Sequence, residues 1–290
     1  MTRPSRPSWS RGRPAAAVAA ALALGVVLVV GVWLQVGERM ALDTRHRASS
    51  SAPDRVDVRA SVQRVDATAR ELVLRLLVTP RGSLAEDDGS APAVGLSLQT
   101  SPEVRGDLNF PAHTRISTVD LQVALGGGSV SDYPFDDYRT VLEFAAQAGG
   151  RPVPVNMTLS NSDALFALDV DASTDDGVAV FDLGIERSGT VLLFGVFMMV
   201  AMWALAIAVL IGARTLVVGR RGLVWPALGW MAATLFALAA FRNTAPGSPP
   251  IGSLLDYLAF LWAEAIVAAS LTVTVLVGAA VENRATAEKS

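Results

Sequence analysis

The sequence predicts an α+β membrane protein with four transmembrane helices and an extracytoplasmic antiparallel β-sandwich inserted between helix 1 and helix 2. Three observations lead to this prediction. The 290-residue chain is 51% hydrophobic with a mean hydropathy of +0.41, which is too apolar for an ordinary soluble protein. It contains four apolar runs of about membrane-spanning length. A polar region of short β-prone runs separates the first apolar run from the other three.

The N-terminal end is a basic tail followed by an apolar run. Residues 1–14 carry four arginines among prolines and serines, and residues 15–35 are predicted to form transmembrane helix 1. A cleaved signal peptide is the alternative. The run is longer than a usual signal core and no small-x-small cleavage site follows it, which favours a retained anchor. The arginines before it predict a cytoplasmic N-terminus.

Residues 36–188 are predicted to form the extracytoplasmic domain, beginning with a stalk of about a dozen residues. The domain carries 14 basic and 23 acidic residues, a net charge of −9, so no nucleic-acid partner is expected. Gly, Pro, Asp and Ser separate eight β-prone runs, a spacing typical of one antiparallel sandwich of immunoglobulin-like size. These runs are 56–65, 71–79, 94–100, 115–125, 138–145, 153–159, 165–170 and 178–185.

Three further spans are predicted at residues 190–212, 223–241 and 254–281. The loop 213–222 contains three arginines and is expected in the cytoplasm with the tail 282–290, whereas the Pro-rich loop 242–253 is expected outside. The arginine-rich, Ala-, Val- and Gly-rich composition is typical of a high-GC bacterial genome. The predicted location is therefore a bacterial plasma membrane. The expected partners are the lipid bilayer and either further copies of the chain or another membrane protein.

Residue usage argues against several kinds of chemistry. The chain has no cysteine and two histidines, and it has no nucleophile elbow, phosphate-binding loop or HExxH helix. We therefore expect no cofactor, no metal site and no enzymatic activity; an envelope-modifying enzyme ranks last among the alternatives.

The segment SDYPFDDYRTVL, residues 131–142, is the central motif of the outer domain. Proline fixes the backbone and an aspartate can cap it, which predicts a turn leading into an alternating strand. The aromatic rings are expected to plug the bottom of the sandwich core. If the Phe135 ring lies in that core, Phe135→Ala should destabilise the domain by about 3–5 kcal/mol.

The outer loop after Arg242 is the surface on which this turn is expected to rest. Arg242 could pair with Asp136 or Asp137 and so couple the two parts; the alternative is a solvated loop with Arg242 at the lipid headgroups. The predicted interface between the outer domain and the helices comprises Tyr133, Pro134, Phe135, Asp136, Asp137, Arg242, Pro249, Pro250 and Asp256.

Glu264 is the charge predicted to lie inside the last span, where an unpaired carboxylate is costly. As a functional residue it would form a proton or cation site with Arg242 or Asp256. As a structural residue it would pair with Arg242 or with Thr and Trp donors on neighbouring helices. Asp256 would then be an acid at a helix N-terminus.

These two motifs give the chain two resemblances. With Tyr133 to Asp136 in the outer domain, the arrangement resembles a family of uncharacterised actinobacterial integral membrane proteins, to which no activity is assigned. The loop residues that carry this resemblance are Arg242, Asn243, Pro249, Pro250, Gly252 and Asp256. The Tyr-Pro-Phe-Asp turn alone resembles the turn at the membrane end of the outer domain in pentameric ligand-gated ion channels. Those channels have four spans after that domain, whereas this chain has three.

The sequence therefore predicts a non-enzymatic membrane protein that binds, senses or supports a membrane complex at the envelope through its sandwich. The alternative is a channel or transporter subunit with Glu264 in the conduction path.

Overall fold

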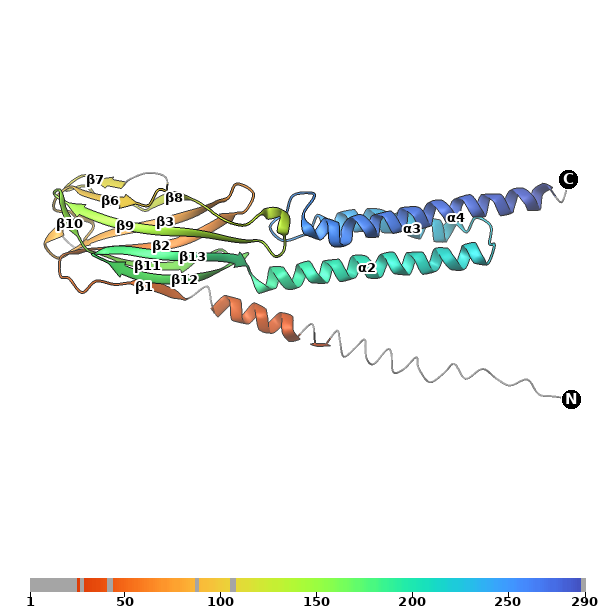
Figure 1. The fold of residues 1–290 in the computed structure, drawn as a ribbon, viewed down its shortest axis with the longest axis horizontal. Helices are drawn as coiled ribbons and strands as arrows, with labels where there is room; N and C mark the ends of the chain where they lie inside the picture. The colour runs from red at the N-terminus through yellow and green to blue at the C-terminus, as the bar shows by residue number, and fades with distance from the viewer. Residues whose placement is uncertain (1–24, 27–28, 41–43, 87–88, 105–107, 288–290) are drawn as a thin grey trace.

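The computed structural model describes residues 25–26, 29–40, 44–86, 89–104 and 108–287. The molecule is elongated: a β-sandwich forms one end and a bundle of helices projects from it (Figure 1). The predicted basic tail 1–14 and most of the predicted span 15–35 lie outside the described residues, as does the end of the predicted C-terminal tail.

Two sheets form the sandwich, and all eight predicted strands are present with shifted ends. One sheet has the order β1-β11-β2-β3-β8; the other has the order β12-β13-β9-β6-β7, with β10 also paired to β9. The predicted strands are β2 (Arg55–Asp66), β3 (Glu71–Arg81), β6 (Leu96–Thr100), β8 (Val119–Ala124), β9 (Asp137–Ala148), β11 (Val155–Asn161), β12 (Phe166–Asp175) and β13 (Val178–Arg187). The additional short strands are β1 (Arg45–Ala48), β4 (Ala85–Glu86), β5 (Ala91–Pro92), β7 (Leu108–Phe110) and β10 (Arg151–Val153).

Two details of the sandwich differ from the prediction. The domain is antiparallel-rich rather than wholly antiparallel, because β11 pairs with β2 in parallel. The chain enters β11 from β9 and β10, which belong to the other sheet, so β11 is not joined to β2 by a tight turn that would impose an antiparallel direction. The expected stalk is also partly ordered as β1, which pairs with β11.

The sandwich core follows from strict alternation along the strands. In β9, Tyr138, Thr140, Leu142 and Phe144 are all buried on one face, as the two-residue period predicts. The same period in β13 buries alternate residues up to its last position, which is occupied by Arg187. The alternation therefore places an arginine on the inward face of the strand, where it needs a partner.

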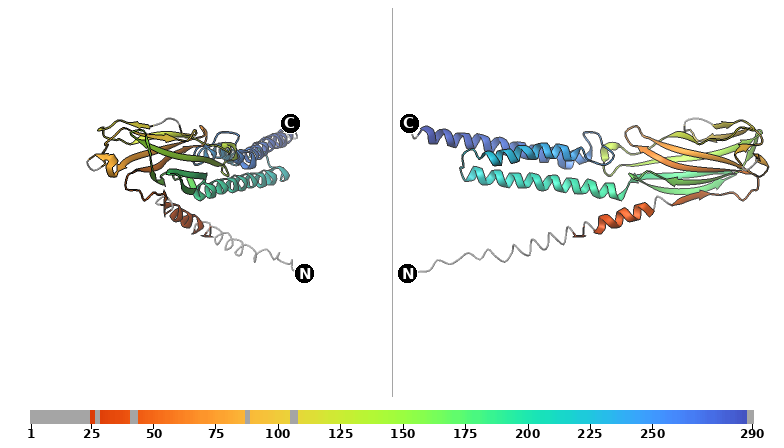
Figure 2. Two further views of the ribbon diagram at one scale, coloured as in Figure 1. Left: turned by 60° about the vertical axis from the view of Figure 1, so that its left-hand side comes forward. Right: turned by 180° about the vertical axis from the view of Figure 1, so that it is seen from behind.

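Three helices follow the sandwich: α2 (Gly189–Val218), α3 (Trp225–Arg242) and α4 (Leu261–Ala287), the last preceded by the π-helical turn η3 (Asp256–Phe260). Side chains of Met198, Met202, Met231, Leu238 and Val267 form their shared apolar core. Both views in Figure 2 show the helices side by side and extending away from the sandwich.

Two of these helices, Gly189–Val218 and Asp256–Ala287, are long and apolar enough to cross a membrane. Four membrane spans are thus not supported within the described residues. α3 is shorter, with 18 residues, and it includes Pro226 and ends in Arg242. Residues 29–40, at the end of the predicted first span, are helical.

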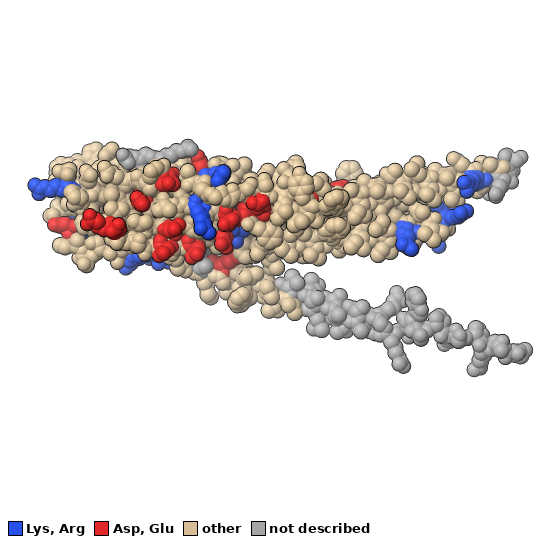
Figure 3. Space-filling model, viewed as in Figure 1, with Lys and Arg blue, Asp and Glu red and all other residues tan. Residues whose placement is uncertain are grey.

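The surface of the helices is apolar over most of its length. Figure 3 shows acidic side chains gathered on the sandwich and basic side chains at the far end of the helices, with few charges between. Exposed apolar side chains on the helices include Phe197, Val200, Ile207, Leu210, Ile211, Phe236, Val273 and Leu276.

Candidate functional site at the junction of sandwich and helices

The turn before β9 inserts two residues into the helical bundle. The Tyr133 side chain is fully buried among helix residues, and its carbonyl oxygen accepts a hydrogen bond from the Leu255 amide at 3.3 Å. Pro134 lies directly against α2, where a Cβ added to Gly195 would come within 2.8 Å of the proline Cγ. The turn thus contacts both the first and the last helix after the sandwich.

The interpretation of Phe135 as a core plug was wrong. Its ring is 51% exposed, whereas Tyr133, two residues earlier, is the buried aromatic. The turn points its first ring at the helices and not into the sandwich. The tyrosine therefore packs in the apolar core of the bundle, and the phenylalanine lies on the surface.

This geometry reverses the expected effect of Phe135→Ala. We expect a loss well under about 1 kcal/mol, because the mutation removes an exposed ring and creates no cavity. Tyr133→Ala should instead cost about 3–5 kcal/mol, the range for truncating a buried aromatic residue. Urea titrations of the detergent-purified protein would measure both values. A larger loss for Phe135→Ala than for Tyr133→Ala would contradict this assignment.

Asp136 forms a buried ion pair with Arg187 at the end of β13. The Arg187 Nε atom donates to both carboxylate oxygens at 3.0 Å, and the side chains are 3% and 0% exposed. The Tyr138 hydroxyl donates to the same carboxylate at 3.0 Å. The guanidinium lies 4.2 Å from the Phe166 ring centroid and 5.2 Å from that of Tyr133, within cation–π range.

A second buried ion pair lies in the helices. Arg242 donates from Nε and Nη2 to the two carboxylate oxygens of Asp256, each at 2.7 Å, and the side chains are 7% and 2% exposed. Nη1 and Nη2 also donate to the Pro249 and Pro250 carbonyls at 3.0 and 2.9 Å, respectively. Arg242 therefore closes the Pro-rich loop onto the end of α3.

The Asp256 carboxylate also accepts hydrogen bonds from backbone amides of the loop. The Gly252 amide donates to it at 2.7 Å and the Ser253 amide at 3.2 Å. Asp256 is therefore both an acid near the start of a helix, as predicted, and the bidentate partner of Arg242.

Two predicted pairings were wrong. Arg242 does not pair with Asp136 or Asp137, since Asp136 is held by Arg187 and Asp137 is exposed. The register of β13 against β9 places Glu186 opposite Asp137, which brings the next residue, Arg187, beside Asp136. Glu264 likewise does not pair with Arg242, whose guanidinium is bonded to Asp256 and to the proline carbonyls.

The Tyr133 side chain lies where these two charged groups meet. Burial raises the pKa of the Tyr133 hydroxyl to about 12, the nearby arginines act in the opposite direction, and Asp136 adds to the rise. Its hydroxyl is buried with no hydrogen-bond partner among the described residues. The ring consequently stays neutral between two arginine–carboxylate pairs.

The raised pKa predicts a loss of stability in alkali. Above pH 10 an unfolded tyrosine releases its proton while folded Tyr133 keeps it, so the folded state binds more protons and stability falls as pH rises. The slope contributed by Tyr133 should be about 1.4 kcal/mol per pH unit between pH 10 and 12. Urea titrations should show a shallower decline for Tyr133→Phe; equal declines would contradict the assignment.

The contact of Pro134 with α2 predicts a steric effect at Gly195. Alanine normally favours a helix over glycine by about 1 kcal/mol, but at this position the new methyl would overlap the proline ring. We expect Gly195→Ala to cost about 1–3 kcal/mol, as overpacking does. The matched control is Gly229→Ala in α3, where no atom lies within 4 Å of the added Cβ. Thermal unfolding should show a loss for the first variant alone.

Residues 29–40 attach to the start of α2 through Glu38. The Thr190 amide donates to Glu38 Oε1 at 2.6 Å, and the Thr190 hydroxyl donates to Oε2. A carboxylate is favourable at a helix N-terminus. Leu193 also lies close to Gly31, so this helical segment lies alongside α2.

The turn η3 is stabilised from α2. A π-helical turn leaves backbone groups without their usual α-helical partners, and such turns are frequent at functional sites. The Trp203 indole N–H donates to the Leu258 carbonyl at 2.9 Å. The Trp203 bond to Leu258 and the Asp256 pair with Arg242 thus fix η3, and with it the start of α4, against α2 and α3.

Glu264 lies in the first turn of α4 and is half-buried. Within the part of the chain that the structure describes, its carboxylate has no hydrogen-bond or ion-pair partner. Neither a Thr nor a Trp side chain among these residues donates to it.

Sequence reasoning missed three contributors to this site, namely Arg187, Glu38 and Gly195. Arg187 could have been found, because it continues the inward-facing period of Phe181, Leu183 and Ile185. The other two contacts join segments far apart in sequence, and no local pattern marks them.

The fold and site define a class of protein: an antiparallel-rich β-sandwich docked on a helical bundle that contains two helices able to cross a membrane. The comparisons divide the chain at the same junction. Residues 46–185 match the family model Domain of unknown function (DUF4436), and residues 187–281 match Domain of unknown function (DUF8686). No curated protein matches the chain. The boundary between the two matches falls next to Arg187, the residue that links the sandwich to the helices.

Proposed function

We propose that this chain is a non-enzymatic, multi-pass plasma-membrane protein of a bacterial envelope, which uses its outer sandwich for binding, sensing or support of a membrane complex. One observation carries the proposal. The sandwich and the helices meet through a buried turn flanked by two desolvated arginine–carboxylate pairs. A force or a ligand acting on the sandwich would therefore act on the helices as well, because a packed interface of this kind is not continuously deformable.

The membrane placement is supported by the apolar surface of the helices and by the aromatic residues exposed at both ends of that surface. Trp225 and Trp230 are exposed near one end of α3, on the side of Arg220 and Arg221, and Tyr257 and Trp262 are exposed near the sandwich. Such aromatic residues favour the two membrane interfaces, and arginines favour the cytoplasmic side. We propose that residues 15–35 and 223–241 also span the membrane, which leaves residues 36–188 outside and both termini inside.

Single cysteines test this topology cleanly, because the chain has none of its own. Intact cells producing Arg151→Cys, Arg221→Cys or Ile251→Cys would be treated with a membrane-impermeant maleimide. We expect labelling at 151 and 251, and at 221 only after the cells are broken. Protection of residue 251 in intact cells would show that residues 223–241 do not cross and would overturn the four-span topology.

A channel or transporter subunit is the second candidate, and the half-buried carboxylate of Glu264 favours it. A carboxylate on a membrane helix is costly unless it is paired or wet, and Glu264 has no partner in the described part of the chain. This function requires a closed ring of four to six copies in native mass spectra and ion flux into liposomes that Glu264→Gln abolishes. A monomer or dimer would rule out the symmetric pore.

A further inference from the structure

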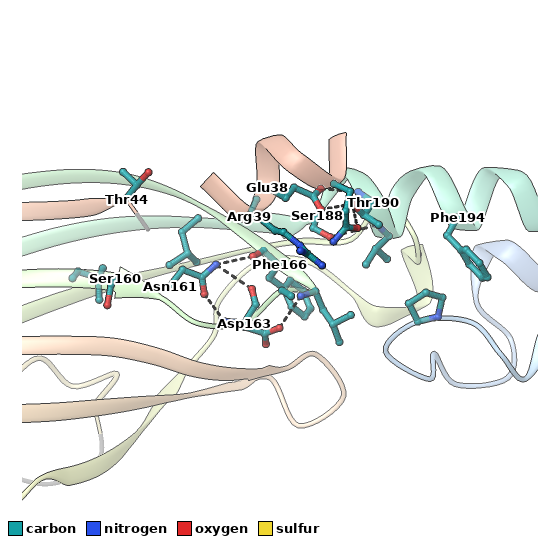
Figure 4. A pocket seen from close by; sticks show the side chains of 18 of the residues that line it. Glu38, Arg39, Thr44, Ser160, Asn161, Asp163, Phe166, Ser188, Thr190 and Phe194 are labelled. Atoms are coloured by element: carbon teal, nitrogen blue, oxygen red, sulfur yellow. Dashed lines mark hydrogen bonds between the residues drawn. The ribbon is translucent and has the colours of Figure 1, made fainter. Parts of the chain in front are cut away.

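A cavity of about 480 Å³ lies beside the junction, between the sandwich, residues 29–40 and the start of α2 (Figure 4). Its volume falls in the usual range of small-molecule sites, about 300–1,000 Å³. It is separate from the two ion pairs at the turn, neither of which contributes a residue to it. The larger apolar side chains of its lining are Leu159, Leu165, Phe166, Leu168, Val191, Phe194 and Pro246.

The acidic groups around the cavity are already engaged. Glu38 accepts from the amide and hydroxyl of Thr190. Asp163 accepts from the amides of Val65 and Leu165 at 2.7 and 2.8 Å. Both carboxylates therefore already accept hydrogen bonds from the protein itself.

Arg39 is the charged side chain at the cavity that is not engaged. It is exposed, and within the described ranges its guanidinium makes no hydrogen bond or ion pair. Figure 4 shows the side chain extending along the cavity toward Phe166 and Ser188. A guanidinium above an apolar floor matches a ligand with an anionic phosphate head and a hydrocarbon tail.

An aromatic path connects the cavity with the apolar surface of the helices. Phe194 lines the cavity, its ring centroid is 6.3 Å from that of Phe197, and Phe197 is in turn 6.3 Å from Phe241. The Phe197 ring is 48% exposed on the helix surface that would face lipid. With the membrane placed as proposed, this surface lies next to the outer leaflet, and the cavity adjoins it through Phe194.

We propose that this cavity binds one anionic phospholipid of the outer leaflet, with its phosphate on Arg39 and one acyl chain along the apolar floor between β12 and α2. This inference rests on the proposed membrane placement. It identifies an anionic phospholipid as the ligand of the outer domain. The bound lipid would bridge residues 29–40, the sandwich and α2, three elements that the cavity already brings together.

The test uses the full chain in liposomes that contain a trace of photoreactive phosphatidylglycerol or, separately, photoreactive phosphatidylcholine. Cross-linked peptides are identified by mass spectrometry. We expect phosphatidylglycerol to label peptides from residues 159–168 and 188–194 in preference to phosphatidylcholine by about tenfold, because the choline ammonium of phosphatidylcholine neutralises the phosphate charge that Arg39 would otherwise pair with. Equal labelling by the two lipids would overturn the anionic preference.

Two variants with matched controls locate the site. Arg39→Gln should reduce phosphatidylglycerol labelling to the phosphatidylcholine level, whereas Arg47→Gln, on exposed β1 and outside the cavity, should not change it. Ala167→Trp fills the cavity and should abolish labelling, whereas Ser173→Trp, exposed further along β12, should not. Unchanged labelling in a folded Ala167→Trp protein would overturn the proposal.

Further arms separate the remaining outcomes. Addition of inorganic phosphate should leave the labelling by phosphatidylglycerol unchanged. If phosphate abolished this labelling, the site would take free phosphate and not a lipid head. Arg39 makes no hydrogen bond within the described fold, so Arg39→Gln should fold even if Ala167→Trp does not. Maleimide labelling of the single-cysteine variants in intact cells reports the topology independently, so failure of the lipid site and failure of the membrane placement are distinguishable.

Discussion

Arg242→Met is expected to lower the free energy of unfolding by about 3–5 kcal/mol, the usual result of removing one partner from a buried ion pair. The mutation would leave the Asp256 carboxylate, 2% exposed, without its bidentate partner and the Pro249 and Pro250 carbonyls without their donors. Tryptophan fluorescence during urea titration would report this loss, because none of the six tryptophans lies in the sandwich.

An exposed pair in the same chain provides the control. Arg75 and Asp120 also form a bidentate contact, but their side chains are 49% and 47% exposed. Exposed pairs contribute little because water screens them. We therefore expect no resolvable change for Arg75→Met. A loss of similar size in both variants would show that burial of the Arg242 pair has no particular importance.

Asp136→Ala is expected to have a comparable effect in the sandwich, a loss of about 3–5 kcal/mol. Arg187 would remain 3% exposed without a counter-charge, and the Tyr138 hydroxyl would lose its acceptor. Far-UV circular dichroism during urea titration would report the loss of secondary structure. Resistance of the sandwich to proteolysis should fall in parallel.

The double variant Asp136→Leu with Arg187→Met separates the pair from its surroundings. Replacing both partners by apolar residues removes the buried charges together, so most of the stability should return. Comparison with Asp136→Leu alone and Arg187→Met alone then gives the coupling energy of the pair. A double variant as unstable as the sum of the single variants would contradict a direct interaction.

The sequence predicted those parts of the fold that local patterns determine. Alternation along 71–79, 138–145 and 178–185 identified strands of the sandwich correctly, because one buried face imposes a two-residue period. Long apolar runs identified α2 and α4 in the same way. Both signals depend on near neighbours in the chain.

The errors concern contacts between segments that are distant in sequence. Phe135 and Tyr133 look alike in the turn, and only the position of the helices decides which ring is buried. Similarly, several acids could have paired with Arg242, and the observed choice depends on where η3 places Asp256. The cavity needs three separate elements, so no single stretch of sequence marks it.

A distance measurement across the junction tests rigid docking most directly. Arg151→Cys lies in β10, at the end of the sandwich away from the helices in Figure 1, and Ile251→Cys lies 90% exposed in the loop after α3. Spin labels on this pair in liposomes should give a single, narrow distance distribution by double electron–electron resonance. A broad distribution, or several separate distances, would show that the sandwich moves freely on the helices and would contradict the account.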